Sequence, residues 1–301
     1  MNNKETKIDA TVIVPTYNRS TLLDYTLHSI LNQDLGHQTI EVIVADDGSD
    51  DNTREIVRKY EPLMRLRYFF QDDKGYRVAS ARNMGIRNAQ GEILIFVDSG
   101  VLLASGCIRE HIQTHRAKEV PQAVIGYVYG YDQYIKNVDT FRDAIDILDP
   151  DRTIGLLRER GEFLDMRHDF YKSVNYSLAG LPAPWIFFVT CNVSATKASL
   201  VEVGMFDENY DYNWGVEDLD LGYRLHANDV SFVVNAAAES IHFPHDREAT
   251  MKEKFGEEVA NKKYFNGKYN TLATRLFMDC TFVELNDKIL ALQSEPSRIT
   301  S

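Results

Sequence analysis

ATVIVPTYNR, residues 10–19, is the stretch that decides the fold. It opens with an apolar, largely β-branched run that ends at a proline, and such a run predicts a strand buried on both faces. Residues 40–45 (IEVIVA) repeat the pattern, and shorter apolar runs follow at residues 66–70 and 93–97. Helical periodicity fills the intervals between these runs. Buried strands that alternate with helices predict an α/β fold with a mainly parallel sheet.

Polar residues gather where the predicted strands end. The first strand runs into YNR (residues 17–19), the second into DDGS (residues 46–49) and the fourth into DSG (residues 98–100). In open α/β sheets, ligands bind beyond the carboxyl ends of the strands. The sequence therefore predicts a ligand site along this edge of the sheet.

The second half of the chain is less regular. Residues 184–193 (PWIFFVTCNV) are strand-like, residues 217–225 have helical periodicity, and residues 230–235 form another short strand pattern. From about residue 249 the sequence is polar and mostly helical.

Composition and charge limit the kinds of partner. The 301 residues include 33 basic and 45 acidic side chains, and the net charge of −12 argues against binding nucleic acid by phosphate neutralisation. No run approaches the roughly 18 apolar residues of a membrane span, and the amino terminus is polar, so we expect a cytoplasmic protein without a transmembrane segment. The three cysteines form no CxxC pair and are expected to be free, buried thiols.

Three common motifs are missing: GxGxxG after the first strand, GxxxxGK[ST] and GxSxG. A nucleotide would therefore be held differently, with its base stacked on Tyr17 and its imide N–H donated to Asp46 or Asp47. The alternative is that these two aspartates only cap the turn and the helix that follow them.

Asp98 and Arg82 are candidates to complete a nucleotide site. Asp98 follows the fourth strand, where a carboxylate can meet a ribose hydroxyl or a metal-bound pyrophosphate, and a simple turn residue is the alternative. Arg82 and Asn83, on the preceding helix, can bind phosphate or ribose through charge-assisted hydrogen bonds. A solvent-exposed arginine is the competing interpretation.

The strongest local signal is NWGVEDLDLGYRL, residues 213–225. Trp214 and Gly215 combine a broad apolar platform with a backbone that can turn sharply. Glu217 and Asp218 then begin a helix, where the macrodipole favours negative charge, and they project about 100° apart. One acid can therefore bind hydroxyl groups while the other takes a proton. The alternative is that both acids only interact with the helix dipole.

A histidine pair follows the last predicted strand. His242 and His245 are three residues apart, so both can reach one cation, and imidazole suits Mn²⁺-like or Zn²⁺-like ions. Single histidines are more often structural, but this pair follows a strand that is expected to end beside the site.

Taken in their order along the chain, these segments resemble the family-2 GT-A glycosyltransferases. The resemblance covers roughly residues 8–248 and rests on PTYNR (15–19), DDGS (46–49), ARNMG (81–85), FVDSG (96–100) and WGVED (214–218). The last segment is similar to the WGxED motif of galactosyl- and N-acetylhexosaminyltransferases, including bacterial chondroitin-type polymerases.

The resemblance implies a domain plan. A single GT-A domain would cover residues 1–250, with a nucleotide-binding half at 1–129 and an acceptor-binding half at 130–250. Residues 251–301 would form a helical C-terminal extension, which packs on the domain or serves as an association surface.

The resemblance also implies roles for named residues. Asp218 would be the catalytic base, Glu217 would assist it and bind the acceptor, and Trp214 would contact the acceptor. A divalent cation, Mn²⁺ or Mg²⁺, would be held by Asp98 with His242 or His245. The UDP-sugar donor would be held by Pro15, Thr16, Tyr17, Arg19, Asp46, Asp47, Arg82, Asp98 and Ser99.

Gly100 departs from the family pattern, because the family usually has there a carboxylate that is the main protein ligand of the cation. Either Asp98 and a histidine hold a weaker cation, or side chains such as Lys74 and Arg82 neutralise the diphosphate instead.

The activity implied is inverting transfer of a hexose or N-acetylhexosamine, in one displacement, from a UDP-sugar to a hydroxyl of a glycan, a lipid-linked sugar or a small molecule. The alternative is a degenerate, non-catalytic module that binds nucleotide-sugars, which Gly100 favours and the intact residues 214–218 oppose. A sugar-1-phosphate nucleotidyltransferase would need a Gly-rich phosphate loop where this chain has PTYNR.

Overall fold

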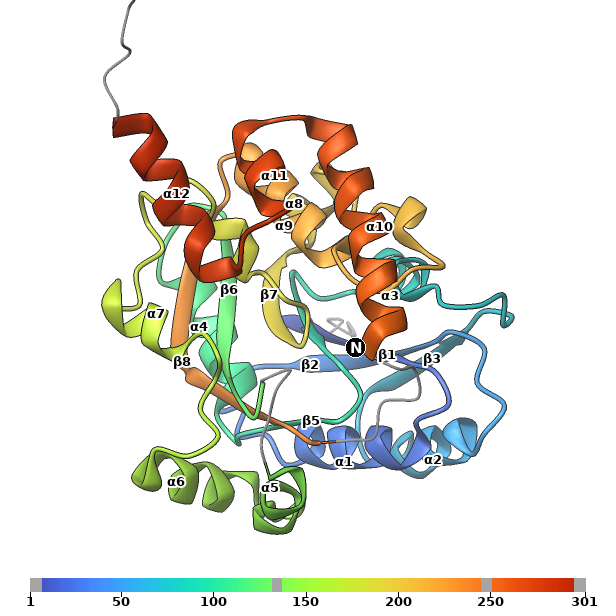
Figure 1. The fold of residues 1–301 in the computed structure, drawn as a ribbon. Coiled ribbons are helices and arrows are strands. Elements are labelled where there is room, and N and C mark those ends of the chain that lie inside the picture. The colour runs from blue at the N-terminus through green and yellow to red at the C-terminus, as the bar shows by residue number, and fades with distance from the viewer. Residues whose placement is uncertain (1–6, 132–136, 245–250, 295–301) are drawn as a thin grey trace, which may run out of the picture.

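The computed structural model describes residues 7–131, 137–244 and 251–294, and their strands form one eight-stranded mixed sheet flanked by helices (Figure 1). The strand order across this sheet is β3-β2-β1-β4-β7-β6-β8-β5. The strands are β1 (Ala10–Thr16), β2 (Ile40–Asp46), β3 (Leu66–Phe70), β4 (Ile93–Val97), β5 (Val101–Leu103), β6 (Gln122–Tyr129), β7 (Asn192–Thr196) and β8 (Ser231–His242).

The first four predicted strands are confirmed, and they pair in parallel as expected. β1 pairs with β2 on one side and with β4 on the other, and β2 pairs with β3. Successive residues of β1 face opposite cores: Ile13 packs in one cluster, whereas Val12 and Val14 pack in the other. Burial on both faces explains why this strand is a continuous apolar run rather than an alternating one.

Helices cover both faces of the sheet (Figure 1). One face carries α1, α2 and α4, and the other carries α3, α9 and the C-terminal helices. The helices of the first part are α1 (Ser20–Leu31), α2 (Thr53–Tyr60), α3 (Val78–Asn88), α4 (Cys107–Arg116), α5 (Val138–Ala144) and α6 (Pro150–Arg160). The remaining ones are α7 (His168–Ser173), α8 (Lys197–Glu202), α9 (Glu217–Ala227), α10 (Met251–Tyr269), α11 (Leu272–Phe277) and α12 (Phe282–Ser294), with short 3₁₀ turns η1 (Pro184–Phe187) and η2 (Glu208–Tyr210).

The strand predicted over residues 184–193 is wrong over its first part. Pro184–Phe187 is a 3₁₀ turn, and β7 begins only at Asn192, antiparallel to β4 and β6. Pro184 lacks the N–H that a central strand must donate. The segment is apolar because Trp185 and Phe187 are enclosed by neighbouring elements on several sides, which gives the same continuous apolar pattern as a buried strand.

The helices predicted after residue 249 are present, and they pack on the domain. Phe265 of α10 and Phe277 of α11 make edge-to-face contacts with Trp185 of η1. Leu285 and Ile289 of α12 join the same core cluster. No helix in the described part of the chain is long and apolar enough to span a membrane.

Candidate active site

The carboxyl ends of β1, β2 and β4 are joined by hydrogen bonds, so the polar segments that follow them lie together. Asp47 donates its backbone N–H to the Thr16 carbonyl at 2.9 Å. The Ser99 hydroxyl donates to the Pro15 carbonyl, also at 2.9 Å. The first hydrogen bond joins the end of β2 to the end of β1. The second joins the segment after β4 to β1, so the side chain of Ser99 and the carbonyl of Pro15 are already used within the protein.

The two aspartates that follow β2 have different partners. Asp46 is fully buried, and it accepts hydrogen bonds from the backbone of Gly48 and Ser49 and from the Tyr68 hydroxyl. Its Oδ1 thus holds the turn, and its Oδ2 is bound to Tyr68 of β3. Asp47 accepts from Gln71 Nε2 at 2.5 Å and from the backbone N–H of Arg77 at 2.6 Å. Burial raises the pKa of Asp47, although these hydrogen bonds act in the opposite sense.

The end of β1 and the residues after it include one exposed aromatic ring and one buried hydroxyl without a partner among the described residues. Tyr17 is 41% exposed, and its hydroxyl donates to Asp73 at 2.9 Å. The Thr16 hydroxyl is buried and has no hydrogen-bond partner within the described residues. Arg19 is partly exposed at the position that precedes α1.

Arg82 connects the nucleotide side of the site to the acidic helix. This residue of α3 is 3% exposed, and its Nη2 donates to Asp98 Oδ1 at 2.9 Å while its Nη1 donates to Glu217 Oε1 at 2.8 Å. Its guanidinium carbon lies 5.5 Å from the centre of the Phe206 ring. The charges of Asp98 and Glu217 outweigh burial and raise the pKa of Arg82. The arginine is thus a buried bridge, not a solvent-exposed side chain.

Glu217 and Asp218 begin α9 after a turn of unusual backbone conformation. Gly215 and Val216 both have positive φ, 89° and 77°. The expectation of a sharp turn before the acids is therefore confirmed. Asp218 is partly buried, and it accepts from the backbone N–H groups of Leu219 and Thr190 at 2.8 and 3.3 Å.

The surroundings of Asp218 stabilise its protonated form, so its pKa is higher than that of an ordinary aspartate. Burial first, and then the neighbouring charge of Glu217, raise the pKa of Asp218 to about 7, against the opposing effect of Arg82. A carboxylate whose pKa lies near neutrality is suited to general-base chemistry. Glu217 itself is 5% exposed, and its Oε2 has no hydrogen-bond partner in the part of the chain that the structure describes.

His242 lies beside the turn that carries Asp98. It ends β8 opposite Val101, and the next residue, Phe243, donates its N–H to the Gly100 carbonyl at 2.8 Å. His245 lies outside the described residues. Over residues 7–131, 137–244 and 251–294, no group of three or more histidine, cysteine or acidic side chains is arranged to hold a metal ion. His242 thus lies beside the segment that follows Asp98, and a cation site formed by these two residues stays a prediction.

Two further residues lie in this region: Asn83, which was expected to bind phosphate or ribose, and Tyr76, to which the motifs gave no role. The side-chain amide of Asn83 exchanges two hydrogen bonds with the backbone of Phe206, both at 2.9 Å, so it holds a loop and does not face a ligand. Tyr76 has a half-exposed ring, but burial and the charges of Glu217 and Asp98 raise the pKa of its hydroxyl. The sequence did not indicate that Tyr76 belongs to the site, because an aromatic residue in the loop before a helix can be there for many structural reasons.

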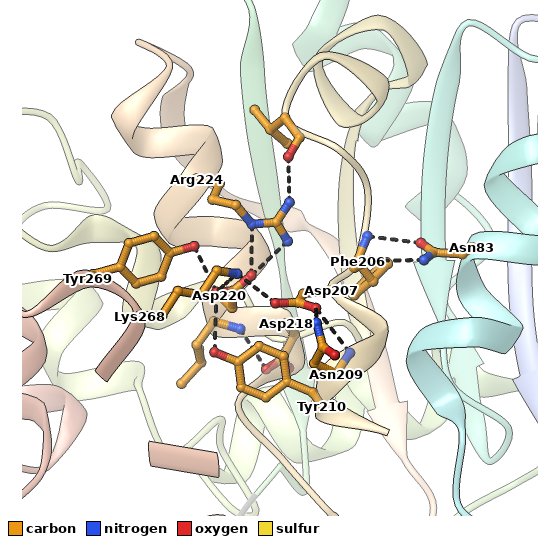
Figure 2. Close-up of polar contacts among 12 residues, drawn as sticks. Asn83, Phe206, Asp207, Asn209, Tyr210, Asp218, Asp220, Arg224, Lys268 and Tyr269 are labelled. Carbon is orange, nitrogen blue, oxygen red and sulfur yellow. Dashed lines mark hydrogen bonds and ion pairs between the residues drawn. The ribbon is translucent and has the colours of Figure 1, made fainter. Parts of the chain in front are cut away.

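Asp220, the third acid of the motif, is the centre of a structural cluster (Figure 2). It is fully buried, and it accepts from Arg224 Nε at 2.7 Å and from Lys268 Nζ and the Tyr269 hydroxyl at 2.8 Å. Its spacing of four residues from Arg224, which puts both side chains on one face of α9, was the available signal for this ion pair.

Comparisons with known proteins identify relatives of this chain in sequence and in fold. The profile described as "Glycosyl transferase family 2" matches residues 11–173. Validoxylamine A glucosyltransferase from Streptomyces hygroscopicus subsp. jinggangensis is 37% identical over 270 residues, which are 90% of this chain and 63% of that protein. The chain thus spans less than two thirds of the length of this curated relative.

Two solved structures have the same GT-A fold. Staphylococcus aureus TarS residues 1–349 in complex with UDP-GlcNAc has a TM-score of 0.63 at 18% identity, over 95% of this chain and 71% of that one. The mannosyltransferase PcManGT from Pyrobaculum calidifontis, in complex with GDP-Man and Mn²⁺, has a TM-score of 0.59 at 19% identity, over 96% of this chain and 70% of that one.

Proposed function

Because the chain belongs to glycosyl transferase family 2, we propose that it is an inverting enzyme that moves a hexose or N-acetylhexosamine from a UDP-sugar to an acceptor hydroxyl. The observation that carries this proposal is the bridge made by Arg82. One buried guanidinium binds Asp98, at the end of the strand expected to face the donor, and Glu217, next to the expected base. Donor and acceptor groups would therefore meet within the reach of one side chain.

The donor would be held at the ends of β1, β2 and β4. The uracil base would stack on Tyr17, and its imide N–H would be donated to Asp47, which requires a rearrangement of the contacts that Asp47 makes with Gln71 and Arg77. The Thr16 hydroxyl, which lacks a partner within the described residues, and Arg19 would bind other polar groups of the nucleotide. The TarS complex with UDP-GlcNAc supports a uridine diphosphate sugar as the donor class.

Asp218 would act as the base. Its carboxylate would take the proton of the acceptor hydroxyl while the acceptor oxygen forms a bond to the anomeric carbon. The bond between that carbon and the diphosphate oxygen would break in the same step, and its electron pair would leave with UDP. General-base catalysis of this kind contributes about 10²- to 10⁴-fold.

Asp98 and His242 fit a divalent cation as two ligands, because carboxylate oxygen and imidazole nitrogen both suit Mn²⁺. Asp98 is 36% exposed and uses one oxygen for Arg82, and His242 borders the same turn. Gly100 contributes no side chain, so the diphosphate and water would supply the other ligands. A bound cation would stabilise the negative charge that develops on UDP. The Mn²⁺ complex of PcManGT supports such an ion.

The acceptor would approach from the side of Trp214 and Glu217. Glu217 Oε2, which has no partner among the described residues, would accept a hydrogen bond from an acceptor hydroxyl. The Trp214 ring would contact the apolar face of the acceptor. Among glycans, lipid-linked sugars and small molecules, the name of the validoxylamine A glucosyltransferase favours a small-molecule acceptor.

The test is a transfer assay combined with calorimetry of UDP binding. We expect wild-type protein to transfer or slowly hydrolyse at least one of UDP-glucose, UDP-galactose and UDP-GlcNAc. Asp218→Asn should bind UDP normally and lose about 10²-fold or more in rate. Asp229→Asn, in the turn after the same helix, is the matched control and should retain full activity. A folded Asp218→Asn protein with wild-type transfer would refute the assignment of the base, and UDP binding without any turnover would favour the non-catalytic module.

A further inference from the structure

The turn that precedes Glu217 and Asp218 has a backbone conformation that Tyr212 and Val216 do not favour, although Gly215 adopts it readily. Tyr212, Gly215 and Val216 all have positive φ, 75°, 89° and 77°. For a β-branched residue such as Val216 this conformation is a genuine outlier, and it persists only when the surrounding structure imposes it. Some neighbouring element must therefore hold this turn in place.

That element is α10, which presents a polar stripe to the turn. Glu257, Asn261, Tyr264 and Lys268 are separated by four, three and four residues, so they share one face of the helix. Tyr264 and Lys268 both donate to Asp207. Figure 2 shows Lys268 between Asp207 and Asp220, to which it also donates. The stripe is thus bound at its C-terminal end to the loop before the turn and to α9.

Asn261 and Glu257 bind the turn itself on both sides of Trp214. Asn261 is 2% exposed, and its Nδ2 donates to the carbonyls of Asn213 at 3.2 Å and Gly215 at 2.7 Å. Glu257 Oε2 accepts the backbone N–H of Trp214 at 2.9 Å. Two peptide units of the turn, 213–214 and 215–216, are therefore fixed by two side chains of one helix.

We propose that Asn261, supported by Glu257, is a positioning residue that sets the orientation of Trp214, Glu217 and Asp218 for sugar transfer. The proposal rests on the proposed function for its catalytic consequence. Both residues lie beyond the segment matched by the family profile, residues 11–173, so α10 completes the acceptor side of the site in this chain. Without the two bonds from Asn261, the carbonyls of residues 213 and 215 lose their partner, and the strained turn has alternatives of lower energy.

The experiment compares Asn261→Leu and Asn261→Asp with Asn286→Leu. Asn286 is the matched control, because it is also buried and its side chain also pairs with the backbone. It accepts from Ala183 N at 2.8 Å and donates to Ala183 O at 3.3 Å. Ala183 precedes η1, so these bonds do not involve the turn before Glu217. Both Asn261 variants should lower kcat/KM for the acceptor by about 10- to 100-fold and leave the Kd for UDP within twofold. Asn286→Leu should lose stability but keep its kinetic constants.

A second readout does not depend on turnover. The chain has two tryptophans, of which Trp185 is fully buried and Trp214 is partly exposed, so acrylamide quenches mainly Trp214. We expect the quenching constant to rise about twofold in both Asn261 variants and to stay unchanged in Asn286→Leu.

The outcomes separate the two proposals. If wild-type protein transfers sugar and a folded Asn261 variant keeps its kcat and acceptor KM, the positioning role is refuted while the enzyme function stands. If wild-type protein transfers nothing, the proposed function fails, and an unchanged quenching constant in both Asn261 variants would still refute the positioning role by itself.

Discussion

Arg82 Nη1 lies 2.8 Å from Glu217 Oε1, although the two residues are 135 positions apart in the chain. Both side chains are almost completely buried, at 3% and 5% exposure. A buried ion pair gains little net stability, because desolvation offsets the Coulomb attraction, but removal of one partner is costly. We therefore regard this pair as a device that fixes α3 relative to α9, and with them the donor and acceptor sides of the site.

Replacement of Arg82 by lysine should uncouple the two sides. Lysine has no planar fork, so it cannot bind Asp98 and Glu217 simultaneously in the same geometry. We expect Arg82→Lys to lower kcat by about 10²-fold and the free energy of unfolding by about 3 kcal/mol. Rate assays and urea unfolding measure these effects. The control is Arg87→Lys, since Arg87 is also on α3 but forms an exposed ion pair, with Glu208 of η2. Equal effects of the two variants would contradict the prediction.

The pH dependence of the rate should report Asp218. As a base it must be deprotonated, and its pKa is raised to about 7, so kcat/KM should rise with pH and level off above about 8. Glu217→Gln removes the neighbouring charge that raises this pKa, and the midpoint of the profile should move to lower pH. An unchanged midpoint in Glu217→Gln would show that another group controls the profile.

The same carboxylate should reduce stability at high pH. A folded-state pKa above the unfolded value of 3.8 means that between pH 4 and 7 the folded protein holds a proton that the unfolded chain has lost. The free energy of unfolding therefore falls as pH rises through this window. Asp218→Asn lacks this loss, so at pH 8 it should be more stable than wild type, by on the order of 2 kcal/mol when partial solvent access is allowed for. In urea unfolding, the free energies of unfolding of the two proteins should become equal near pH 4. Equal free energies at pH 8 would be evidence against a destabilising charge on Asp218.

Acid should destabilise the protein through two histidines of α4. His111 lies 2.8 Å from Asn192 Oδ1 and 2.9 Å from Ser194 Oγ, and His115 lies 2.8 Å from the same hydroxyl. Burial lowers the pKa of His111 to about 4 and that of His115 to about 3. Below about pH 6.5 the unfolded chain binds protons that the folded protein does not, so stability falls as pH falls, by about 3 kcal/mol at pH 4 for His111 alone. A double variant with glutamine at both positions should lose this slope in pH-dependent unfolding, and retention of the full slope would contradict the assignment.

The cation should act through Asp98 and His242. We expect Mn²⁺ to strengthen UDP binding in calorimetry and His242→Ala to reduce that gain about tenfold or more, without changing the affinity measured in EDTA. His28→Ala, on α1, is the control. Equal UDP affinity with Mn²⁺ and with EDTA in the wild type would instead assign charge neutralisation to arginine and lysine side chains.

The sequence by itself determined the elements whose pattern is local. The strands at residues 10–15, 40–45 and 93–97 were predictable because burial on both faces favours a nearly continuous apolar run. The strand at residues 66–70 is only partly buried and was indicated by its leucine and aromatic residues. The polar segments at the carboxyl ends of these strands and the helix that begins at Glu217 were predictable for a related reason. Where a strand ends and where a helix starts are both indicated by nearby residues. The same rule failed at Pro184–Phe187, where a 3₁₀ turn inside the core is as apolar as a strand.

Only the tertiary structure decided which distant side chains meet. The sequence placed Arg82 on a helix beside the site, but it did not indicate Glu217 as its partner, and it gave Asn261 no role. A helical pattern indicates which face is buried, whereas the identity of the buried neighbour depends on how helices from opposite ends of the chain pack on the sheet. That packing brings α10 against the strained turn at Val216 and α3 against α9, and so converts separate motifs into one site.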